Sequence, residues 1–529
     1  MRASPLAAAG CFAVFLSPPA AGGQQPSTTP PVPRRVAILE AATSTLQTHP
    51  LLQAQKKQVE ISLAVRQQRS GDFDTQMLWT ADLSHSVTPL TGPARLSLQQ
   101  AGVDVVSESL NLATVTGSFS KLFRSGIQFG PTLEMTRTTG NVESSDGVSR
   151  ARVSFDVSVP LLRGRGKAVV AAPERAADVQ AAASQLDFSQ TAADLLLSTA
   201  ISYWHYVGAV RRLVIAEDSE ARARDYVASV DLLIEADKLP RSERFQVRAN
   251  LAGRAADRIT SEQQLADARY GLALAMGLSP TEGLQIPPPA DSFPEVERQP
   301  VPDSPAGIRP YIDLALTNRA DYLAAEKRKQ AADILRISAT NGVLSKLDVV
   351  MSAGYSGLQE GRAAWDYFGS LYRTAGGPDL LVGLRWSRPF ANNTAEGQLA
   401  EADATYRQAV LLASDRERNV SSEVSSALSG VYHGVRRLAQ AREAVTLYEA
   451  ALEGERDKLR LAAGSLTDLL TVEGRMTSAL VDLVAAQEAY AVALAQLRHA
   501  TGTLVPADRP VTSIDRDVFF SPPSLRLPD

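Results

Sequence analysis

The stretch SVPLLRGRGKAVV carries Gly164 and Gly166 one residue apart with a lysine behind them, a composition that could hold a phosphate group. A Walker loop has a glycine, four further residues and then Gly-Lys-Ser/Thr, because its amides cradle phosphates and its hydroxyl holds magnesium. Leu161 and Ala168 occupy the places of the first glycine and the hydroxyl. A dinucleotide loop would need a third glycine where Val169 stands. The stretch therefore does not predict a nucleotide site.

Other reactive side chains are not spaced for catalysis. None of the five histidines belongs to an H-x-x-x-H or H-E-x-x-H pair, and no Gly-x-Ser-x-Gly turn occurs. Cys11 is the only cysteine, so an intrachain disulfide or a cysteine metal cluster is excluded. The net charge of −4 offers no basic face to a nucleic acid. We expect no enzyme, no cofactor, no metal site and no nucleic-acid partner.

The N-terminus has the pattern of an export signal. Arg2 precedes an apolar run from Leu6 to Leu16, and small residues follow at Ala20 and Gly22, which predicts a signal peptide over residues 1–23. A disordered apolar N-terminus, or a lipoprotein signal that would leave Cys11 lipidated, remains an alternative. No later run of about 18 apolar residues exists, so we predict no membrane-spanning helix.

The same order of elements occurs twice. Residues 49–64 align with residues 319–335, GAVRRL at 208–213 matches HGVRRL at 433–438, and Pro160 aligns with Pro389. These matches predict two structural repeats, each running helix, strands, long helix, break, shorter helix. The first repeat spans residues 24–278, with strands at about 72–162 and a helical hairpin at about 168–277. A proline-rich linker (279–307) leads to the second repeat (308–502), with strands at about 345–390 and a hairpin at about 395–502. A tail (503–529) follows.

Long stretches of both repeats have heptad spacing. One register holds Val424, Val431, Leu438, Val445, Leu452 and Leu459, and another holds Leu469, Met476, Leu483, Tyr490 and Leu497. The first repeat has a weaker register at Tyr206, Leu213, Val227 and Ile234. Such seams predict coiled-coil arms much longer than the average helix of about 11–12 residues. The helices alone would fit an elongated coiled-coil structural or binding protein of the cell envelope, which is the alternative reading.

Four stretches of about ten residues alternate between apolar and polar side chains, as membrane-crossing strands do. In RVSFDVSVP, Val153, Phe155 and Val157 alternate with Ser154 and Asp156. A sheet in lipid must close, and the smallest single-chain barrels have about eight strands, so several chains would have to share one barrel.

The signal, the two tandem halves and the stretch VPLLRGRG between a strand and a long helix resemble the outer-membrane factor (TolC) family of bacterial efflux and type I secretion channels. The fold class that follows is mainly α with a transmembrane β-barrel. The resemblance implies a homotrimer with twelve strands in the outer membrane and twelve helices around a periplasmic tunnel. It also implies a periplasmic adaptor protein and an inner-membrane pump as partners. Pro160, Gly164, Gly166 and Pro389 would form the strand-to-helix junctions at the inner rim of the membrane.

The helical hairpins turn at residues 236–245 and 462–470. Gly464 is expected to take the left-handed conformation that ends a helix, Ser465 or Thr467 to cap the next helix, and Ser242 to cap the helix after Pro240. In the resembling family these turns meet the adaptor. The residues that the resemblance assigns to docking are Lys238, Leu239, Pro240, Ser242, Gly464, Ser465, Leu466 and Thr467. Glu473, one turn inside the mouth, would be a gate residue whose three copies converge on the trimer axis. Its position beside Leu469 and Met476 leaves alternatives open, in which it is a solvated helix glutamate or faces a partner helix.

Two segments depart from the simplest plan of that family. LNLATVTGSFSKLF and GIQFGPTLEMT, within residues 108–138, are joined by the tight turn FRSG. They could form a hairpin that enlarges the barrel or one that caps it outside the cell, and the sequence leaves both open. The cargo, and the choice between efflux and protein secretion, are open as well.

Overall fold

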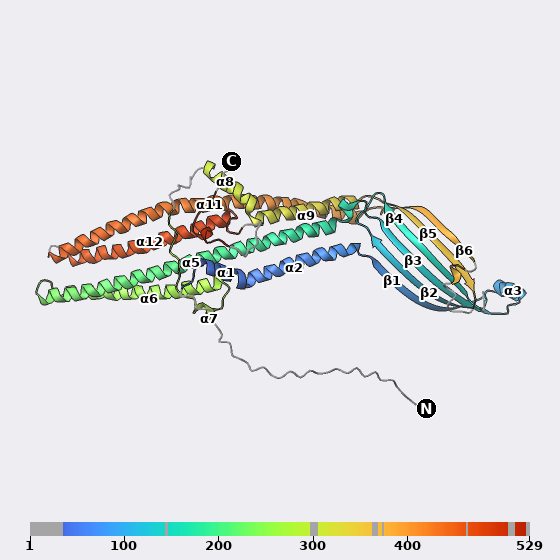
Figure 1. Ribbon diagram of the computed structural model, residues 1–529, viewed down its shortest axis with the longest axis horizontal. Helices are drawn as coiled ribbons and strands as arrows, with labels where there is room; N and C mark the ends of the chain where they lie inside the picture. Colours follow the sequence, from blue (N-terminus) through green and yellow to red (C-terminus); the bar gives the residue numbers. More distant parts are fainter. Residues whose placement is uncertain are drawn as a thin grey trace, which may run out of the picture.

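The protein is elongated, with long helices at one end and a β-sheet at the other (Figure 1). The structure is a computed structural model that describes residues 35–142, 146–296, 305–361, 369–372, 375–461, 464–505 and 514–524. The predicted signal peptide (residues 1–23) and Cys11 lie outside the described residues.

Two helical hairpins form the long end. The first consists of α5 (Ala172–Glu235) and α6 (Glu243–Ala275), and the second of α11 (Asn393–Arg460) and α12 (Leu466–Ala500). The heptad positions of the second hairpin lie in its packed interior. Those that are buried are Val424, Val431, Leu438, Val445, Leu452, Leu469, Met476, Tyr490 and Leu497. The hydrophobic seams therefore fasten the arms in pairs, as the register predicts.

By length and mean hydropathy alone, α12 qualifies as a candidate membrane span, a result that differs from the expectation of none. However, 44% of its most apolar 18-residue window is buried inside the protein. The core helix of a bundle passes the same test, because its apolar face is covered by neighbouring helices. Here α11 and α5 pack against α12.

Shorter helices continue the arms toward the sheet. The helix α2 (Pro50–Ser70) begins where α6 ends, and α9 (Ala320–Gly342) begins where α12 ends (Figure 1). Both joints are tight, because a Cβ on Gly277 would lie 2.7 Å from His49 Cα and one on Gly502 would lie 2.7 Å from the carbonyl carbon of Asn318. The two glycines, with φ of 76° and 68°, occupy equivalent places in the two repeats.

A belt of short elements surrounds the middle of the arms. It contains α1 (Ile38–Thr48), α7 (Pro280–Gly283), α8 (Pro305–Asn318) and η2 (Arg516–Phe519). The largest core lies beneath it, around Tyr203 and Trp204 of α5. The Tyr203 hydroxyl donates to Asp291 Oδ2 at 2.8 Å, which ties the segment after α7 to the arm.

The sheet has six antiparallel strands in sequence order. They are β1 (Gln76–Pro89), β2 (Ser107–Leu122), β3 (Gln128–Gly140), β4 (Val148–Pro160), β5 (Lys346–Glu360) and β6 (Ala375–Ser387). Two short helices, η1 (Gly71–Phe73) and α4 (Lys167–Val170), flank the first four strands, and α3 (Gly92–Gln100) lies at the far end between β1 and β2 (Figure 1). The four alternating stretches of the sequence are β1, β4, β5 and β6. The segments within 108–138, whose place the sequence leaves open, form β2 and β3 inside the sheet.

Candidate functional site: a strand face, a helix seam and two helix tips

The pairing register brings apolar side chains from all six strands onto one face of the sheet. For example, Val157 of β4 lies opposite Phe129 of β3 and Met351 of β5, and Met351 lies opposite Val382 of β6. The larger members of this apolar face are Met77, Trp79, Leu83, Val115, Phe119, Phe129, Leu133, Met135, Val153, Phe155, Val157, Val349, Met351, Tyr355, Leu380, Val382, Leu384 and Trp386.

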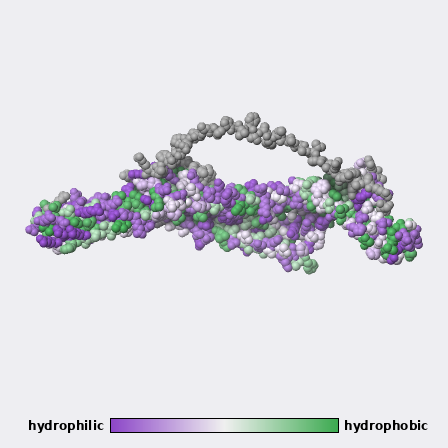
Figure 2. All heavy atoms as spheres, turned by 90° about the horizontal axis from the view of Figure 1, so that it is seen from below, coloured by the Kyte–Doolittle hydropathy of each residue, from purple (hydrophilic) through white to green (hydrophobic). Residues whose placement is uncertain are grey.

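The opposite face is mostly polar. Its members include Thr80, Asp82, Thr114, Thr116, Ser118, Thr132, Glu134, Arg152, Ser154, Asp156, Ser158, Ser352, Asp379 and Arg385. Apolar exceptions include Leu78, Leu110, Leu112, Val350, Leu358 and Leu381. Much of the apolar face lies open, with Leu83 88% and Leu384 72% exposed. Figure 2 shows hydrophobic residues on the visible surface at this end of the molecule. A soluble protein rarely exposes so large an apolar surface, so this face needs an apolar environment.

The edges of the sheet are uncovered in the single chain. Within the residues that the structure describes, each of β1 and β6 pairs on one side only, and every residue of β1 is exposed. Unpaired backbone groups are costly in lipid, where no water can satisfy them. If the apolar face meets lipid, both edges must therefore pair with further strands.

The glycines of VPLLRGRG have a structural role at the strand-to-helix junction. Gly164 and Gly166 have φ of 79° and 92°. The Gly166 amide donates to Ser125 O at 2.9 Å, and a Cβ on Gly126 would lie 2.1 Å from the carbonyl oxygen of Gly164. The β2–β3 turn therefore packs directly against this stretch, and Pro160 at the end of β4 lies beside the turn. The positive φ values account for Gly164 and Gly166, and the close contact accounts for Gly126, so no phosphate is needed to explain these glycines.

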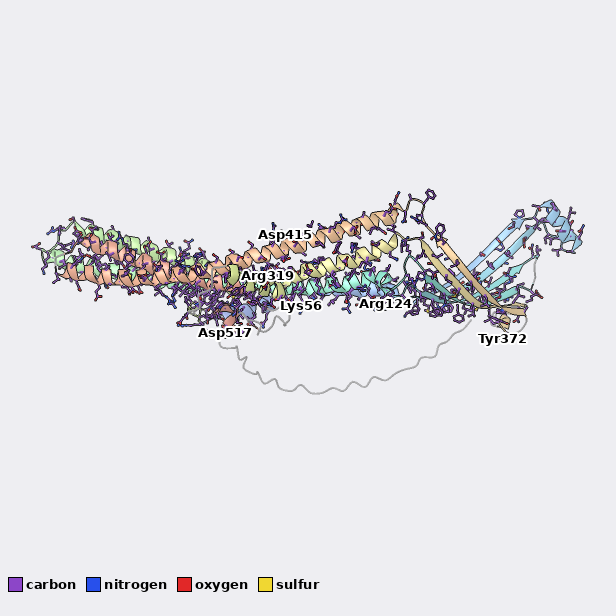
Figure 3. All side chains as sticks on the ribbon, turned by 90° about the horizontal axis from the view of Figure 1, so that it is seen from above. Lys56, Arg124, Arg319, Tyr372, Asp415 and Asp517 are labelled. Atoms are coloured by element: carbon purple, nitrogen blue, oxygen red, sulfur yellow. The ribbon has the colours of Figure 1, made fainter. Side chains whose placement is uncertain are left out.

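Two further residues complete the junctions. Pro389 lies exposed in the connection from β6 to α11, where Asn392 takes a left-handed φ of 48°. Arg124 in the β2–β3 turn binds Glu174 of α5 at 2.6 Å and stacks 4.7 Å from the centre of the Phe73 ring. Figure 3 shows Arg124 where the helices meet the strands and Tyr372 at the opposite end of the sheet.

Solved outer-membrane channels share this arrangement. The chain superposes on the outer-membrane channel OprN with a TM-score of 0.62 at 16% identity, covering 88% of this chain and 90% of that one. It matches the CmeC outer-membrane channel of Campylobacter jejuni (TM-score 0.61, 13% identity, 90% and 87% covered). It also matches the outer-membrane protein VceC of Vibrio cholerae (TM-score 0.61, 16% identity, 88% and 96% covered). The chain has the fold of the outer-membrane factor channels. No family model and no curated protein sequence matches it.

In this outer-membrane factor fold the two hairpins meet along a partly polar seam between α5 and α12. Glu488 of α12 accepts hydrogen bonds from His205 and, at 2.8 Å, from Arg212, both on α5. Farther toward the sheet, His499 contacts Asp194 at 2.6 Å. The hydrogen bond to Glu488 raises the pKa of His205 above its ordinary value of 6.5, although burial and Arg212 oppose the rise. Burial raises the pKa of Glu488, but His205 and Arg212 outweigh this effect and leave it lowered.

We expect this contact to weaken in alkaline solution. Because the folded pKa of His205 is raised, its stabilisation is complete below pH 6.5 and is lost as the pH rises through the folded value. Exposure of the imidazole limits the effect to about 1 kcal/mol or less. Hydrogen exchange of α5 and α12, corrected for intrinsic rates, should show less protection around His205 and Glu488 at pH 8.5 than at pH 6. His205→Gln should lose this pH dependence, and an unchanged dependence in that variant would assign the effect to other groups.

Glu473 does not face open solvent as a free carboxylate, contrary to what a gate ring requires. Its side chain is 3% exposed, and it lies between α12, α5 and α6. Arg222 Nε lies 3.0 Å and Arg254 Nη2 3.4 Å from its carboxylate, and the hydroxyls of Ser219 and Thr477 also donate to it. The acidic group therefore links the two hairpins. Addition of further chains can only cover it more.

The hairpin tips differ in part from the expected turns. Ser465 caps α12 by accepting from the Thr467 amide at 3.2 Å, as predicted. Ser242 makes no side-chain cap bond. Gly464 is not among the residues with positive φ, and at the other tip Asp237 has a φ of 56° instead. Gly464 is required for a different reason, since a Cβ there would lie 2.9 Å from Lys458 Cβ.

The exposure of the tip residues separates packing from possible docking. Leu466 is 4% exposed and Leu239 is partly buried, so both belong to the small core of the tip. Lys238, Pro240, Ser242, Ser465 and Thr467 are exposed. The sequence reading missed Leu232, Phe245 and Leu461, which are 68%, 76% and 79% exposed near the same turns. The sequence could have indicated their exposure, because each is an apolar residue outside the heptad positions that pack the hairpins together.

The two tips lie side by side. Gln246 Nε2 of the first hairpin donates to Thr467 Oγ1 of the second at 3.1 Å. Within the part of the chain that the structure describes, no group of three or more His, Cys, Asp or Glu side chains is placed to hold a metal ion.

Proposed function

We propose that this chain is the outer-membrane exit duct of a tripartite efflux or type I secretion system. The observation that carries the proposal is the continuous apolar face on an open-edged sheet attached to long paired helices. The sheet would lie in the outer membrane and the helices in the periplasm, after export directed by residues 1–23. The partners would be two further copies of the chain, a periplasmic adaptor and an inner-membrane pump, and no catalytic step is assigned to the chain.

An elongated coiled-coil protein without a channel is the competing function. It explains the helical hairpins, but it leaves exposed apolar residues such as Leu83, Leu384 and Trp386 in water. Burial of apolar surface contributes about 25 cal/mol per Å², so such a face in water forgoes a large stabilisation. The channel function gives this face lipid to contact.

Assembly provides the main test. Because the sheet edges are open, the protein extracted from outer membranes in mild detergent should have the native mass of three chains. It should also migrate differently on a gel before and after heating, as closed membrane barrels do. A folded, stable monomer under these conditions, or fractionation with soluble proteins, would contradict the channel function.

The exposed apolar residues at the tips are the proposed contact for the adaptor. Phe245→Asp combined with Leu461→Asp should lower adaptor cross-linking and export about tenfold or more, because a charge would have to be buried in the contact. Insertion in the outer membrane should be unchanged. Phe245→Leu is the matched control, since it keeps an apolar side chain. Export at normal levels in the double Asp variant would remove the tips from the docking surface. Substitution of Leu466 is a poorer probe, because it would unfold the tip itself.

A further inference from the structure

The β2–β3 hairpin is built into the sheet on both of its sides. The strand β2 pairs with β1 from Gln76–Ser120 to Pro89–Ser107, and β3 pairs with β4 from Gln128–Ser158 to Thr138–Val148. The hairpin therefore separates β1 from β4. A cap folded over an existing barrel would leave β1 and β4 as neighbours.

The side chains of the hairpin continue both faces of the sheet. On β2, Val115 lies opposite Met135 on the apolar face, and Thr116 lies opposite Glu134 on the polar face. On β3, Leu133 lies opposite Val153 of β4. Both strands thus have the pattern of membrane-crossing strands, with apolar residues toward lipid and polar residues toward a lumen.

The inner end of the hairpin is fastened to the helices. Arg124 in its turn pairs with Glu174 at the start of α5 and covers the ring of Phe73 just before β1. Gly126 packs closely against Gly164, since a Cβ on Gly126 would lie 2.1 Å from the carbonyl oxygen of Gly164. The turn is therefore held at the same level as the strand-to-helix junction, where the other strands end.

We propose that this protein forms an eighteen-stranded barrel in the outer membrane, in place of the twelve strands that the resemblance implies. The number follows from six strands in each of three copies, so it rests on the homotrimer of the proposed function. In the closed barrel, β6 of each copy pairs with β1 of the next. With a strand spacing of about 4.8 Å and a tilt of about 40°, the backbone diameter increases from about 24 Å to about 36 Å.

The extra width belongs to the barrel alone. Each chain supplies two helical hairpins, continued by α2 and α9, in the same plan as the solved channels that it matches over 88–90% of its length. The periplasmic tunnel therefore keeps its width while the outer-membrane part widens. The limit on cargo size lies in the helical tunnel, and the barrel is a wide vestibule lined partly by threonines such as Thr114, Thr116 and Thr132.

Cross-linking in native outer membranes tests where the hairpin lies. The experiment uses a Cys11→Ala background. One variant has cysteines at both Ala81 and Val115, which tests the β1–β2 contact, and another has cysteines at both Leu133 and Val153, which tests the β3–β4 contact. A short thiol-specific cross-linker should join both pairs within one chain. A pair at Val115 and Met135 joins β2 to β3 in either arrangement and is the positive control. Failure of the first two pairs while the control reacts would overturn the proposal.

Arginine substitutions separate a membrane strand from an extracellular one. Val115→Arg should reduce the amount of inserted trimer at least tenfold, whereas Thr116→Arg should leave it unchanged, because only the first side chain faces lipid. Equal tolerance of both would place β2 outside the membrane and overturn the proposal.

Electron microscopy of the purified trimer measures the width directly. The full chain should have a barrel about 1.5 times as wide as a variant that lacks residues 107–140, in which β1 and β4 become neighbours. If that variant does not insert, the diameter of the full-length barrel still decides between about 36 Å and about 24 Å. A mass of two chains would overturn the eighteen strands, while the absence of any inserted barrel would instead reject the proposed function.

Discussion

Val153→Arg is expected to abolish most outer-membrane assembly. Val153 lies in the middle of β4, on the apolar face, between Leu133 and Tyr355 of the adjacent strands. An arginine facing lipid near the bilayer midplane costs about 2–4 kcal/mol, and this cost falls to about 0–1 kcal/mol near the interfaces. The proposed trimer would contain the substitution three times, so the penalty applies to each chain that inserts.

Two further substitutions in β4 are the controls, one at a different depth in the membrane and one on the opposite face of the sheet. Val157→Arg, nearer the helical end of β4, should have a smaller effect than Val153→Arg, and Ser158→Arg should have almost none because Ser158 lies on the polar face. The native Arg152 already occupies the polar face beside Val153. The heat-sensitive trimer band in isolated outer membranes measures assembly. Similar yields for Val153→Arg and Ser158→Arg would show that the apolar face does not contact lipid.

The sequence predicts the elements well because their signals are local. A seven-residue repeat such as Val424, Val431 and Leu438 makes one stripe on a helix, and these three residues are in fact buried in one core. Alternation over a single strand likewise selects its apolar face. Neither pattern indicates which strands pair with each other. The place of the 108–138 hairpin therefore required the sheet, because its contacts with β1 and β4 are set by register and not by its own composition.

The site residues were less predictable because charged and glycine residues act through distant partners. Glu473 lies four residues after Leu469 and three before Met476, so helical spacing puts it beside the buried seam. A side chain at such a position can face either the partner helix or a lumen, so the spacing does not decide between a packed carboxylate and a gate. Its partners Arg222 and Arg254 are more than two hundred residues away in sequence and have no pattern that announces the pairing. Gly464 was read as a conformational glycine, whereas its close contact with Lys458 is what requires it.

The same buried charge leads to the second large effect. Arg222→Ala combined with Arg254→Ala would leave Glu473 without its two cationic partners at a position that is 2% exposed. Removal of the partner of a buried charge costs about 3–5 kcal/mol, because the remaining ion is neither hydrated nor paired. The contact of α12 with α5 and α6 should then loosen near the tips. Faster hydrogen exchange there, together with a larger single-channel conductance, would report the opening.

A third substitution tests whether charge causes this effect. Addition of Glu473→Gln to the double variant replaces the unpaired carboxylate with a neutral amide of the same shape, so protection and conductance should return most of the way to the original values. Arg248→Ala, at a side chain that is 62% exposed and lies 3.9 Å from the partly exposed Asp231, is the matched control and should change the free energy of unfolding by less than about 1 kcal/mol. If the triple variant is as open as the double variant, the two arginines stabilise the tips by packing of their alkyl chains. The link between the hairpins would then be steric and not electrostatic.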